Sequence, residues 1–284
     1  MGMSTYQELT DKSIAMIEDG RWDEAFDDLK RREANGEKEA IAVLAQFYLY
    51  GVGIAQDVDY AVELLDKAIS MGSADAAWEL GKLYYENEVG FPIDKCKAVE
   101  LFEKGAQSGN ENCYGILSEC LLHGEGTSAD GIKAFRYAMM GAKAGNALAM
   151  LNAAICYEDG LGTNSDPFAA AHWYKEYLNF APEDDFAMSR IALCLADPYG
   201  YFGIRTTGEM LNEAFYYAGK AVEKGNVEAH TIIGLFYEKG EIVQQDFDLA
   251  HKYLQLAADN GDEFAQEHLK DYRKTVYGNY FLLN

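Results

Sequence analysis

Residues able to act as nucleophiles, bases or metal ligands are present in this chain, but their spacing matches no known catalytic site. The motifs G-x-x-x-x-G-K-[ST], H-E-x-x-H, G-x-S-x-G and S-x-x-K are all absent, and the five histidines are scattered along the sequence. These motifs build a phosphate cradle, a zinc site or an activated serine, and each needs its residue types at a fixed spacing. We therefore expect a protein without catalytic activity and without a cofactor.

The cysteines are better explained as core residues than as metal ligands. Cys120 and His123 are three residues apart and Cys113 stands seven residues before Cys120, so the three could share one helix face. A cysteine on an apolar helix face is usually a small buried residue, and we expect no metal. The odd total of five cysteines favours free thiols in a cytosol-like compartment.

The charge balance indicates what kind of partner the chain could attract. It carries 24 basic and 47 acidic residues, a net charge of −23, so nucleic acid and anionic membranes would be repelled and a basic protein attracted. The alternative is that the acidic residues only keep exposed helix faces solvated. No apolar run approaches the roughly 18 to 20 residues that span a bilayer, and no basic and then apolar leader is present, so we expect a cytoplasmic protein.

The helices that must position these residues recur six times. A small residue opens the first helix of each unit, an aromatic residue or leucine follows eight residues later, and a glycine or alanine closes the unit. The opening residues are Ala40, Ala76, Cys113, Ala149, Ala187 and Ala229, which are 36, 37, 36, 38 and 42 residues apart. A fixed period of 20 to 50 residues is typical of a solenoid.

The length of each unit predicts one hairpin of two helices. Two helices of about 13 residues and two short turns use roughly 36 residues. Within the second helix, small residues stand seven apart, as in the pair Ala61 and Ala68 and the pair Ala98 and Gly105. Such pairs lie on one helix face, where they let a neighbouring helix approach closely.

The sequence of these hairpins resembles the Sel-one-like repeat family, a relative of the tetratricopeptide repeat. The likeness is clearest in AAWELGKLY at Ala76–Tyr84, KAVELFEKGAQSG at Lys97–Gly109 and AHTIIGLFY at Ala229–Tyr237, and it covers about residues 37–262. The resemblance implies an all-α fold, a right-handed α/α superhelix of stacked antiparallel helix hairpins. Two departures are the Phe180-Ala181-Pro182 ending of the fourth unit and a longer connecting loop in the fifth.

The predicted domain is one solenoid with a cap at each end. Residues 1–36 are expected to form a capping hairpin, because Gly20–Ala25 is similar to the start of a tetratricopeptide second helix. Residues 263–284 are expected to form a helix to about Val276 and then an apolar tail, which either covers the last hairpin or binds a partner. The six repeats are about 37–72, 73–109, 110–145, 146–182, 183–225 and 226–262.

The resemblance also indicates where a partner would bind. In this family and its relatives the first helices line a concave face, so their outward residues are candidate contacts, with packing between neighbouring helices as the alternative. These candidates are Gln46, Tyr50, Trp78, Lys82, Tyr85, Glu86, Glu119, His123 and Glu158. The aromatic residues Tyr199, Tyr201 and Phe202 make the long loop of the fifth repeat a second candidate.

Three functions are compatible with these features to different degrees. The first is a non-enzymatic scaffold or adaptor that grips a protein or peptide of basic character in an acidic, aromatic-lined concave groove. The alternative is an acidic immunity or inhibitor-type protein that neutralises a basic toxin or nuclease. A hydrolase, suggested by the penicillin-binding activity discussed for relatives, is disfavoured because no nucleophile has an adjacent base.

Overall fold

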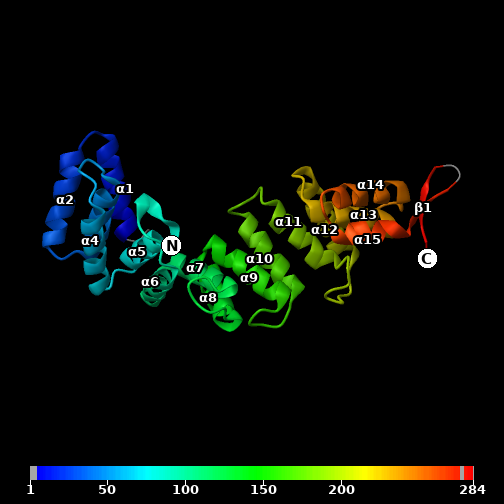
Figure 1. Cartoon of the computed structure of the whole chain (residues 1–284), viewed down its shortest axis with the longest axis horizontal. Helices are drawn as coiled ribbons and strands as arrows, with labels where there is room; N and C mark the ends of the chain where they lie inside the picture. Colours follow the sequence, from blue (N-terminus) through cyan, green and yellow to red (C-terminus); the bar gives the residue numbers. More distant parts are fainter. Residues whose placement is uncertain (1–4, 276–277, 284) are drawn as a thin grey trace. The chain divides into compact units, whose positions relative to one another are not determined.

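The computed structural model describes residues 5–275 and 278–283, and it shows paired antiparallel helices between Thr5 and His268 (Figure 1). The chain divides into two compact units, residues 1–149 and 150–284. The helix α9 (Ala147–Asp159) spans this division. The predicted all-α stack of hairpins is confirmed, whereas a right-handed superhelix in one continuous domain stays a prediction.

The described residues of the first unit form four helix hairpins. In the described part of residues 1–36, α1 and α2 form a hairpin, and α1 packs against α3 as well as α2; a capping role for this hairpin stays a prediction. A short 3₁₀ turn, η1 (Glu88–Gly90), follows α5. The helices are α1 (Thr5–Glu18), α2 (Trp22–Ala34), α3 (Lys38–Tyr50), α4 (Val58–Ser70), α5 (Ala74–Glu86), α6 (Lys95–Gln107), α7 (Glu111–His123) and α8 (Gly131–Ala144).

The second unit continues the helix pairs and ends in a small β-hairpin. Its helices after α9 are α10 (Pro167–Leu178), α11 (Asp185–Ala196), α12 (Gly208–Glu223), α13 (Val227–Lys239), α14 (Phe247–Asp259) and α15 (Glu263–His268). A 3₁₀ turn, η2 (Leu269–Asp271), leads into β1 (Tyr272–Lys274), which pairs antiparallel with β2 (Tyr280–Leu282) so that Tyr272 lies opposite Leu282.

The prediction of a helix from Glu263 to about Val276 is therefore wrong beyond His268. The Tyr272 side chain accounts for the early end of the helix, because it is buried against α14 and its hydroxyl donates to Glu238 Oε2 on α13 at 2.6 Å. Val276 itself lies outside the described residues.

In five hairpins of the described residues, the turn between the two helices repeats the same hydrogen bonds. An aspartate caps the second helix by accepting a backbone N–H of the first turn, which satisfies one of the donors left over at a helix start. The backbone N–H of the same aspartate donates to the carbonyl of the register residue near the end of the first helix. The pairs are Asp57 with Tyr48, Asp94 with Tyr84, Asp130 with Leu121, Asp166 with Tyr157 and Asp246 with Tyr237.

Small residues let successive hairpins approach closely, as the sequence predicts. A Cβ on Gly105 would lie 2.5 Å from Cys113 Sγ, and a Cβ on Gly141 would lie 2.5 Å from Ala149 Cβ. Ala98 and Ala134 are fully buried. The second helix of one hairpin therefore contacts the first helix of the next at a distance that larger side chains would prevent.

The thiols are mostly part of this core. Cys113, Cys120, Cys156 and Cys194 are buried and Cys96 is exposed, and burial raises the pKa of Cys120 to about 11. His123 is exposed while Cys113 and Cys120 are buried, so these three side chains do not share one environment. Among the described residues, no helix is both long and apolar enough to cross a bilayer.

Candidate partner-binding site

A ladder of capping asparagines sets the spacing of the first helices in the first unit. Asn110 caps α7 by accepting the N–H of Cys113, and its Nδ2 donates to Asp75 Oδ1 on α5 at 2.9 Å. Asn146 repeats this arrangement, since its Oδ1 accepts the N–H of Ala149 and its Nδ2 donates to Asn112 Oδ1 on α7 at 3.2 Å. Each cap therefore ties the start of its own helix to the start of the preceding first helix.

A groove runs along these helix starts, and we call it the α1 groove because α1 forms one of its walls. It has a volume of about 580 Å³, within the range of ligand-binding clefts. Its lining residues come from α1, from the first turns of α3, α5 and α7, and from the ends of the hairpins between them. They are Tyr6, Gln7, Lys38, Glu39, Gly72, Ala74, Asp75, Trp78, Glu79, Ser108, Gly109, Asn110, Glu111 and Asn112.

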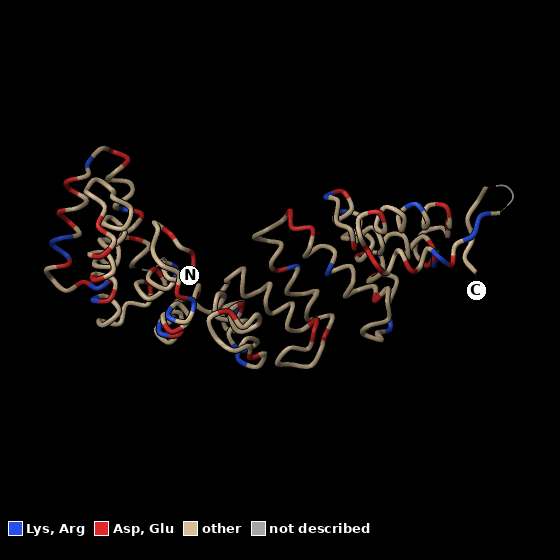
Figure 2. The backbone as a smooth tube through the Cα atoms, viewed as in Figure 1, with Lys and Arg blue, Asp and Glu red and all other residues tan. Residues whose placement is uncertain are grey.

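The α1 groove is predominantly acidic. Its charged lining residues are one lysine, Lys38, and the four carboxylates of Glu39, Asp75, Glu79 and Glu111. The Lys38 ammonium donates to the Gly72 carbonyl at 2.6 Å, so it is already engaged at one edge of the groove. Figure 2 shows the wider context, in which acidic residues are spread over the helices of both units with fewer basic ones between them.

Burial changes the proton affinity of several groups in the groove. The pKa values of Glu39 and Asp75 are raised, mainly by burial, and the negative charge of Asp75 raises that of Glu39 further. Burial, together with the charge of Glu79, also raises the pKa of Tyr6, whose hydroxyl accepts from Gln46 Nε2 at 2.5 Å. The groove is therefore a partly desolvated environment in which negative charges lie close together.

The predicted aromatic contacts on α5 are only partly exposed. Trp78 lines the α1 groove, and its ring lies 5.5 Å from that of Phe102 on α6. Tyr85 also packs on Phe102, at 6.0 Å, and its hydroxyl donates to Glu125 Oε2 at 2.6 Å. These two side chains therefore combine packing within their own hairpin with a remaining accessible surface.

The other candidates in the first unit differ in their accessibility. Tyr50 is 45% exposed and its hydroxyl donates to Glu88 Oε2 at 2.7 Å. Glu86 and His123 are exposed, Glu119 is half-buried, and Lys82 lies 3.3 Å from Glu79 Oε2. Gln46 is half-buried because α1 covers part of α3.

Glu158, in the second unit, does not lie on an open face as expected. It is buried, and its Oε2 accepts from the hydroxyl of Tyr174 at 2.8 Å and from Arg190 Nε at 3.1 Å. Arg190 also donates to Glu228 Oε1 at 2.9 Å. Since a buried carboxylate needs such partners to remain charged, Glu158 holds α9, α10 and α11 together and is not displayed to a partner.

The long loop of the fifth repeat is organised by Asp197. Its carboxylate accepts the N–H groups of Phe202 at 3.1 Å and Ile204 at 3.3 Å. Tyr199 is half-buried, with its ring 4.7 Å from Phe264 on α15, whereas Tyr201 is 71% exposed. Of the three aromatic residues predicted to bind a partner here, Tyr201 is the one that the loop displays.

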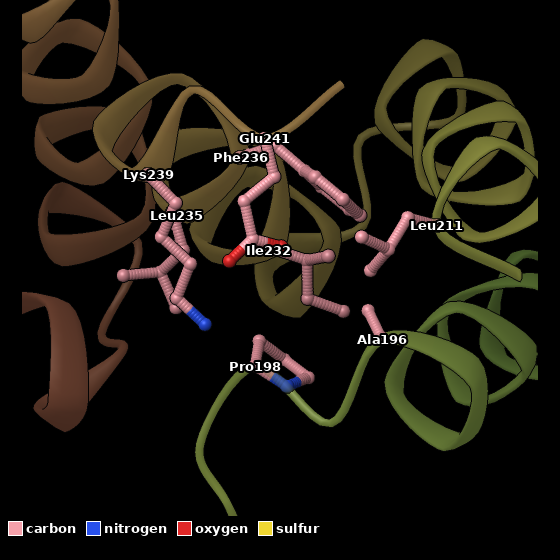
Figure 3. A pocket seen from close by; sticks show the side chains of 8 residues that line it. All are labelled: Ala196, Pro198, Leu211, Ile232, Leu235, Phe236, Lys239 and Glu241. Atoms are coloured by element: carbon pink, nitrogen blue, oxygen red, sulfur yellow. The ribbon is translucent and has the colours of Figure 1, made fainter. Parts of the chain in front are cut away.

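A small hollow lies beside this loop. It is lined by Ala196 and Pro198 from the end of α11, by Leu211 of α12 and by residues of α13 and the turn after it. Figure 3 shows the apolar side chains around the hollow, with the charged ends of Lys239 and Glu241 beside them. The repeat pattern gave no sign of it, because the hollow depends on how the long loop is placed.

Comparison with known proteins agrees with this architecture of stacked helix hairpins. The Sel1 repeat family profile matches residues 38–73, 74–110, 114–146, 147–176, 211–226 and 227–262, which together exceed half of the chain. The chain therefore belongs to the Sel1 repeat family. The profile leaves out 177–210, the segment that holds both departures noted in the sequence, although α11 forms there as an ordinary first helix.

Curated relatives are similar over part of their length. Chitin synthase regulatory factor 3 of Schizosaccharomyces pombe is 27% identical over 228 residues, 78% of this chain and 24% of the relative. The chitin synthase regulator SKT5 of Saccharomyces cerevisiae is 26% identical over 273 residues, 90% of this chain and 38% of the relative. HRD3A of Arabidopsis thaliana, an ERAD-associated E3 ubiquitin-protein ligase component, is 30% identical over 152 residues, 49% and 22% of the two chains. The chain thus spans less than half of the length of each of these relatives.

Solved structures show the same fold. A Sel1 repeat protein from Oxalobacter formigenes superposes with a TM-score of 0.60 at 22% identity, covering 88% of this chain and 96% of that one. The protective antigen c5321 of uropathogenic Escherichia coli has a TM-score of 0.58 at 24% identity, covering 94% and 67%. At these identities the likeness defines the fold and leaves the function open.

Proposed function

We propose that this protein is a non-enzymatic scaffold or adaptor that binds a segment of a partner protein along the first helices of its first unit. The observation that carries the proposal is the α1 groove, which combines a volume of about 580 Å³ with the Trp78 ring and a mainly acidic lining. Aromatic side chains in such clefts supply a large share of binding energy in protein interfaces. The groove contains polar groups without the nucleophile and adjacent base that acyl transfer needs.

The relatives support a role in protein interactions. Two of them are named as regulators of chitin synthase and a third as a component of a ubiquitin ligase, and these names describe proteins that act on or with other proteins. The net charge of −23 supports a partner of basic character, since it would speed the approach of positive charge. The proposal includes a cytoplasmic location, where the buried thiols would stay reduced.

Affinity purification from extracts of the source organism tests the proposal. The chain is used as bait at low salt, and the captured proteins are compared between wild type and Trp78→Ala/Tyr85→Ala. We expect the double variant to lose its specific partner, because the substitutions remove both aromatic rings from the partly exposed side of α5. The control is Tyr216→Ala, which removes a ring that is 54% exposed on α12 in the second unit.

Both rings pack on Phe102, so the helicity and melting temperature of the double variant are measured first. Tyr50→Ala, at a 45% exposed side chain, provides a second variant that leaves this packing intact. If the folded double variant and Tyr50→Ala both capture the partner as well as the wild type does, the proposal is contradicted.

The acidic charge also favours the second candidate, an inhibitor-type protein that covers a basic toxin or nuclease. Such an interface would depend mainly on charge, so its affinity would fall steeply with ionic strength. The salt dependence of the captured complex tests the inhibitor function. A dissociation constant that is nearly constant between low and physiological salt would exclude the inhibitor function.

A further inference from the structure

The asparagine ladder of the first unit is incomplete at its first step. Asn110 donates to Asp75 on α5, and Asn146 donates to Asn112 on α7. The residue that caps α5 is Ser73, whose hydroxyl oxygen accepts the N–H of Ala76 and which has no side-chain amide to donate to α3. Glu39, which stands at the position of Asp75 one hairpin earlier, therefore lacks the amide donor that Asp75 and Asn112 receive, and the shorter Ser73 side chain bonds to its carboxylate instead.

The consequence is a carboxylate oxygen without a donor. Glu39 Oε2 is buried and has no hydrogen-bond partner among the described residues, while Oε1 lies 3.6 Å from the ammonium of Lys38. Lys38 itself donates to the Gly72 carbonyl. A buried acceptor left without a donor costs free energy, so a donor supplied from outside would be favoured at this place.

The surroundings of Glu39 define the chemistry of that donor. Asp75 and Glu79 line the same groove, and burial raises the pKa values of Glu39 and Asp75 although the Lys38 ammonium lowers both. A cation offsets the negative charge of these carboxylates through both a hydrogen bond and Coulomb attraction, whereas a neutral amide acts through the hydrogen bond alone. No group of acidic, histidine or cysteine side chains in the described part of the chain is arranged to hold a metal ion, which favours an organic cation.

The Trp78 ring favours a cation carried on a chain of methylene groups, as in lysine or arginine. It lines the groove one helical turn after Asp75 and directly before Glu79. Lysine and arginine side chains lay their methylene groups along apolar surface while their charged ends reach polar partners, and their charge is attracted to an indole face. Carboxylates and an indole ring in one groove fit this combination.

We propose that the α1 groove binds a lysine or arginine side chain of an extended partner segment, with Glu39 and Asp75 as the acceptors and Trp78 beside the methylene stem. This inference rests on the proposed function, and it assigns the recognition to Glu39 and Asp75, neither of which was a predicted contact. The bound ammonium or guanidinium donates to Glu39, at the position where the ladder has no asparagine amide.

Fluorescein-labelled peptides test this subsite with the full chain. One peptide has a Gly-Ser sequence with several lysines, one has the same sequence with arginines, and the control carries Nε-acetyl-lysine at the same places. In low salt we expect the lysine and arginine peptides to bind at least about tenfold more tightly than the acetylated one, because acetylation removes the charge. Equal binding of charged and acetylated peptides, or no binding of either, would overturn the inference.

Variants then locate the site. Glu39→Gln/Asp75→Asn is expected to weaken lysine-peptide binding by about tenfold or more, as expected for the loss of charge-assisted hydrogen bonds. The matched control is Asp59→Asn/Glu63→Gln, which removes the same charge from exposed positions on α4 and should change affinity less than about twofold. Equal weakening by both pairs would show general charge attraction and overturn the assignment.

Two further measurements keep the outcomes distinct. Asp75 accepts a bond from Asn110, so Asp75→Asn could disturb the fold, whereas Glu39→Gln alone breaks no hydrogen bond at Oε2 and should still weaken binding. The natural partner is also tested with each variant. Partner capture that needs Trp78 and Tyr85 but is indifferent to Glu39→Gln would refute the cation subsite and leave the scaffold function standing.

Discussion

The contact between Gly105 and Cys113 offers the sharpest test of how the hairpins stack. In the preceding hairpin the corresponding residues are Ala68 and Ala76, both fully buried. In the α6–α7 contact, Gly105 stands in place of the first alanine and Cys113 in place of the second. The Cys113 Sγ therefore occupies the space beside Gly105. The two differences compensate each other if close packing decides the contact.

The size of each effect follows from the structure. A Cβ on Gly105 would lie 2.5 Å from Cys113 Sγ and 3.3 Å from the Ala74 carbonyl oxygen, which is overpacking that costs about 1 to 3 kcal/mol. Replacing a mid-helix glycine by alanine returns about 1 kcal/mol through helix propensity. We therefore expect Gly105→Ala to lower the free energy of unfolding by about 1 kcal/mol.

The second single variant and the double variant complete a thermodynamic cycle. Cys113→Ala removes a buried Sγ and should cost about 1 to 2 kcal/mol through lost contacts and a small cavity. Gly105→Ala/Cys113→Ala restores the alanine pair of the preceding hairpin, so the new methyl group fills the space that the sulfur leaves. We expect it to lie within about 1 kcal/mol of wild type, a favourable coupling of at least about 1 kcal/mol.

Urea unfolding followed by tryptophan fluorescence measures the cycle. Of the three tryptophans, Trp22 and Trp78 lie in the first unit and Trp173 in the second, so a Trp173→Phe background reports on the first unit alone. Additive effects of the two substitutions, or a Gly105→Ala variant more stable than wild type, would refute the idea that the Gly105 contact is limited by space.

Three further predictions concern stability and pH. Glu158→Ala should lower the free energy of unfolding of the second unit by about 3 kcal/mol, because the half-buried Arg190 keeps Glu228 but loses Glu158. Glu158→Gln keeps the shape and an acceptor oxygen and should cost less; urea unfolding measures both, and equal effects would contradict a role for these hydrogen bonds. Asn110→Ala should cost about 1 to 2 kcal/mol because it removes the cap of α7 and the bond to Asp75, and Asn110→Ser, which keeps a cap, should cost less in the same assay. Because the bond to Glu238 raises the pKa of His268 above its ordinary 6.5, that pair stabilises the fold fully below about pH 6.5 and loses its effect as the pH rises through the folded pKa. The melting temperature of wild type should therefore fall more than that of His268→Gln between about pH 5.5 and 8.5, and parallel curves would argue against the pair.

The fold could be predicted because one short pattern recurs with little variation. The spacing from Ala76 to Tyr84 sets the length of a first helix, and the aspartate bond to the Tyr84 carbonyl then fixes the turn to the second. Asp197 shows how a departure is accommodated, since its carboxylate organises the longer loop while α11 is only one residue shorter than α9. The end of the chain was mispredicted because the burial of Tyr272 is a tertiary effect, which depends on its contact with Glu238 of α13.

The candidate site was predicted less completely than the fold. The repeat pattern identified Trp78, but it could not show that Glu39 and Asp75 share a groove with it, because that groove needs α1, which lies outside the repeats. The sequence did contain one indication, because Glu39 and Asp75 each stand directly before the alanine that opens a repeat. Glu158 was misplaced because its burial depends on Arg190, 32 residues further along the chain.

The β-hairpin bears on how repeats could be gained or lost in this protein. Tyr272, Tyr280 and Leu282 pack on the apolar cluster around Leu254, and Asp248 of α14 accepts the N–H of Tyr280 at 2.7 Å. Any additional helix pair stacked on α14 would first have to displace these two strands. Insertion of a unit between existing hairpins leaves the contacts of the two strands with α14 unchanged, so the apolar face of α14 stays covered.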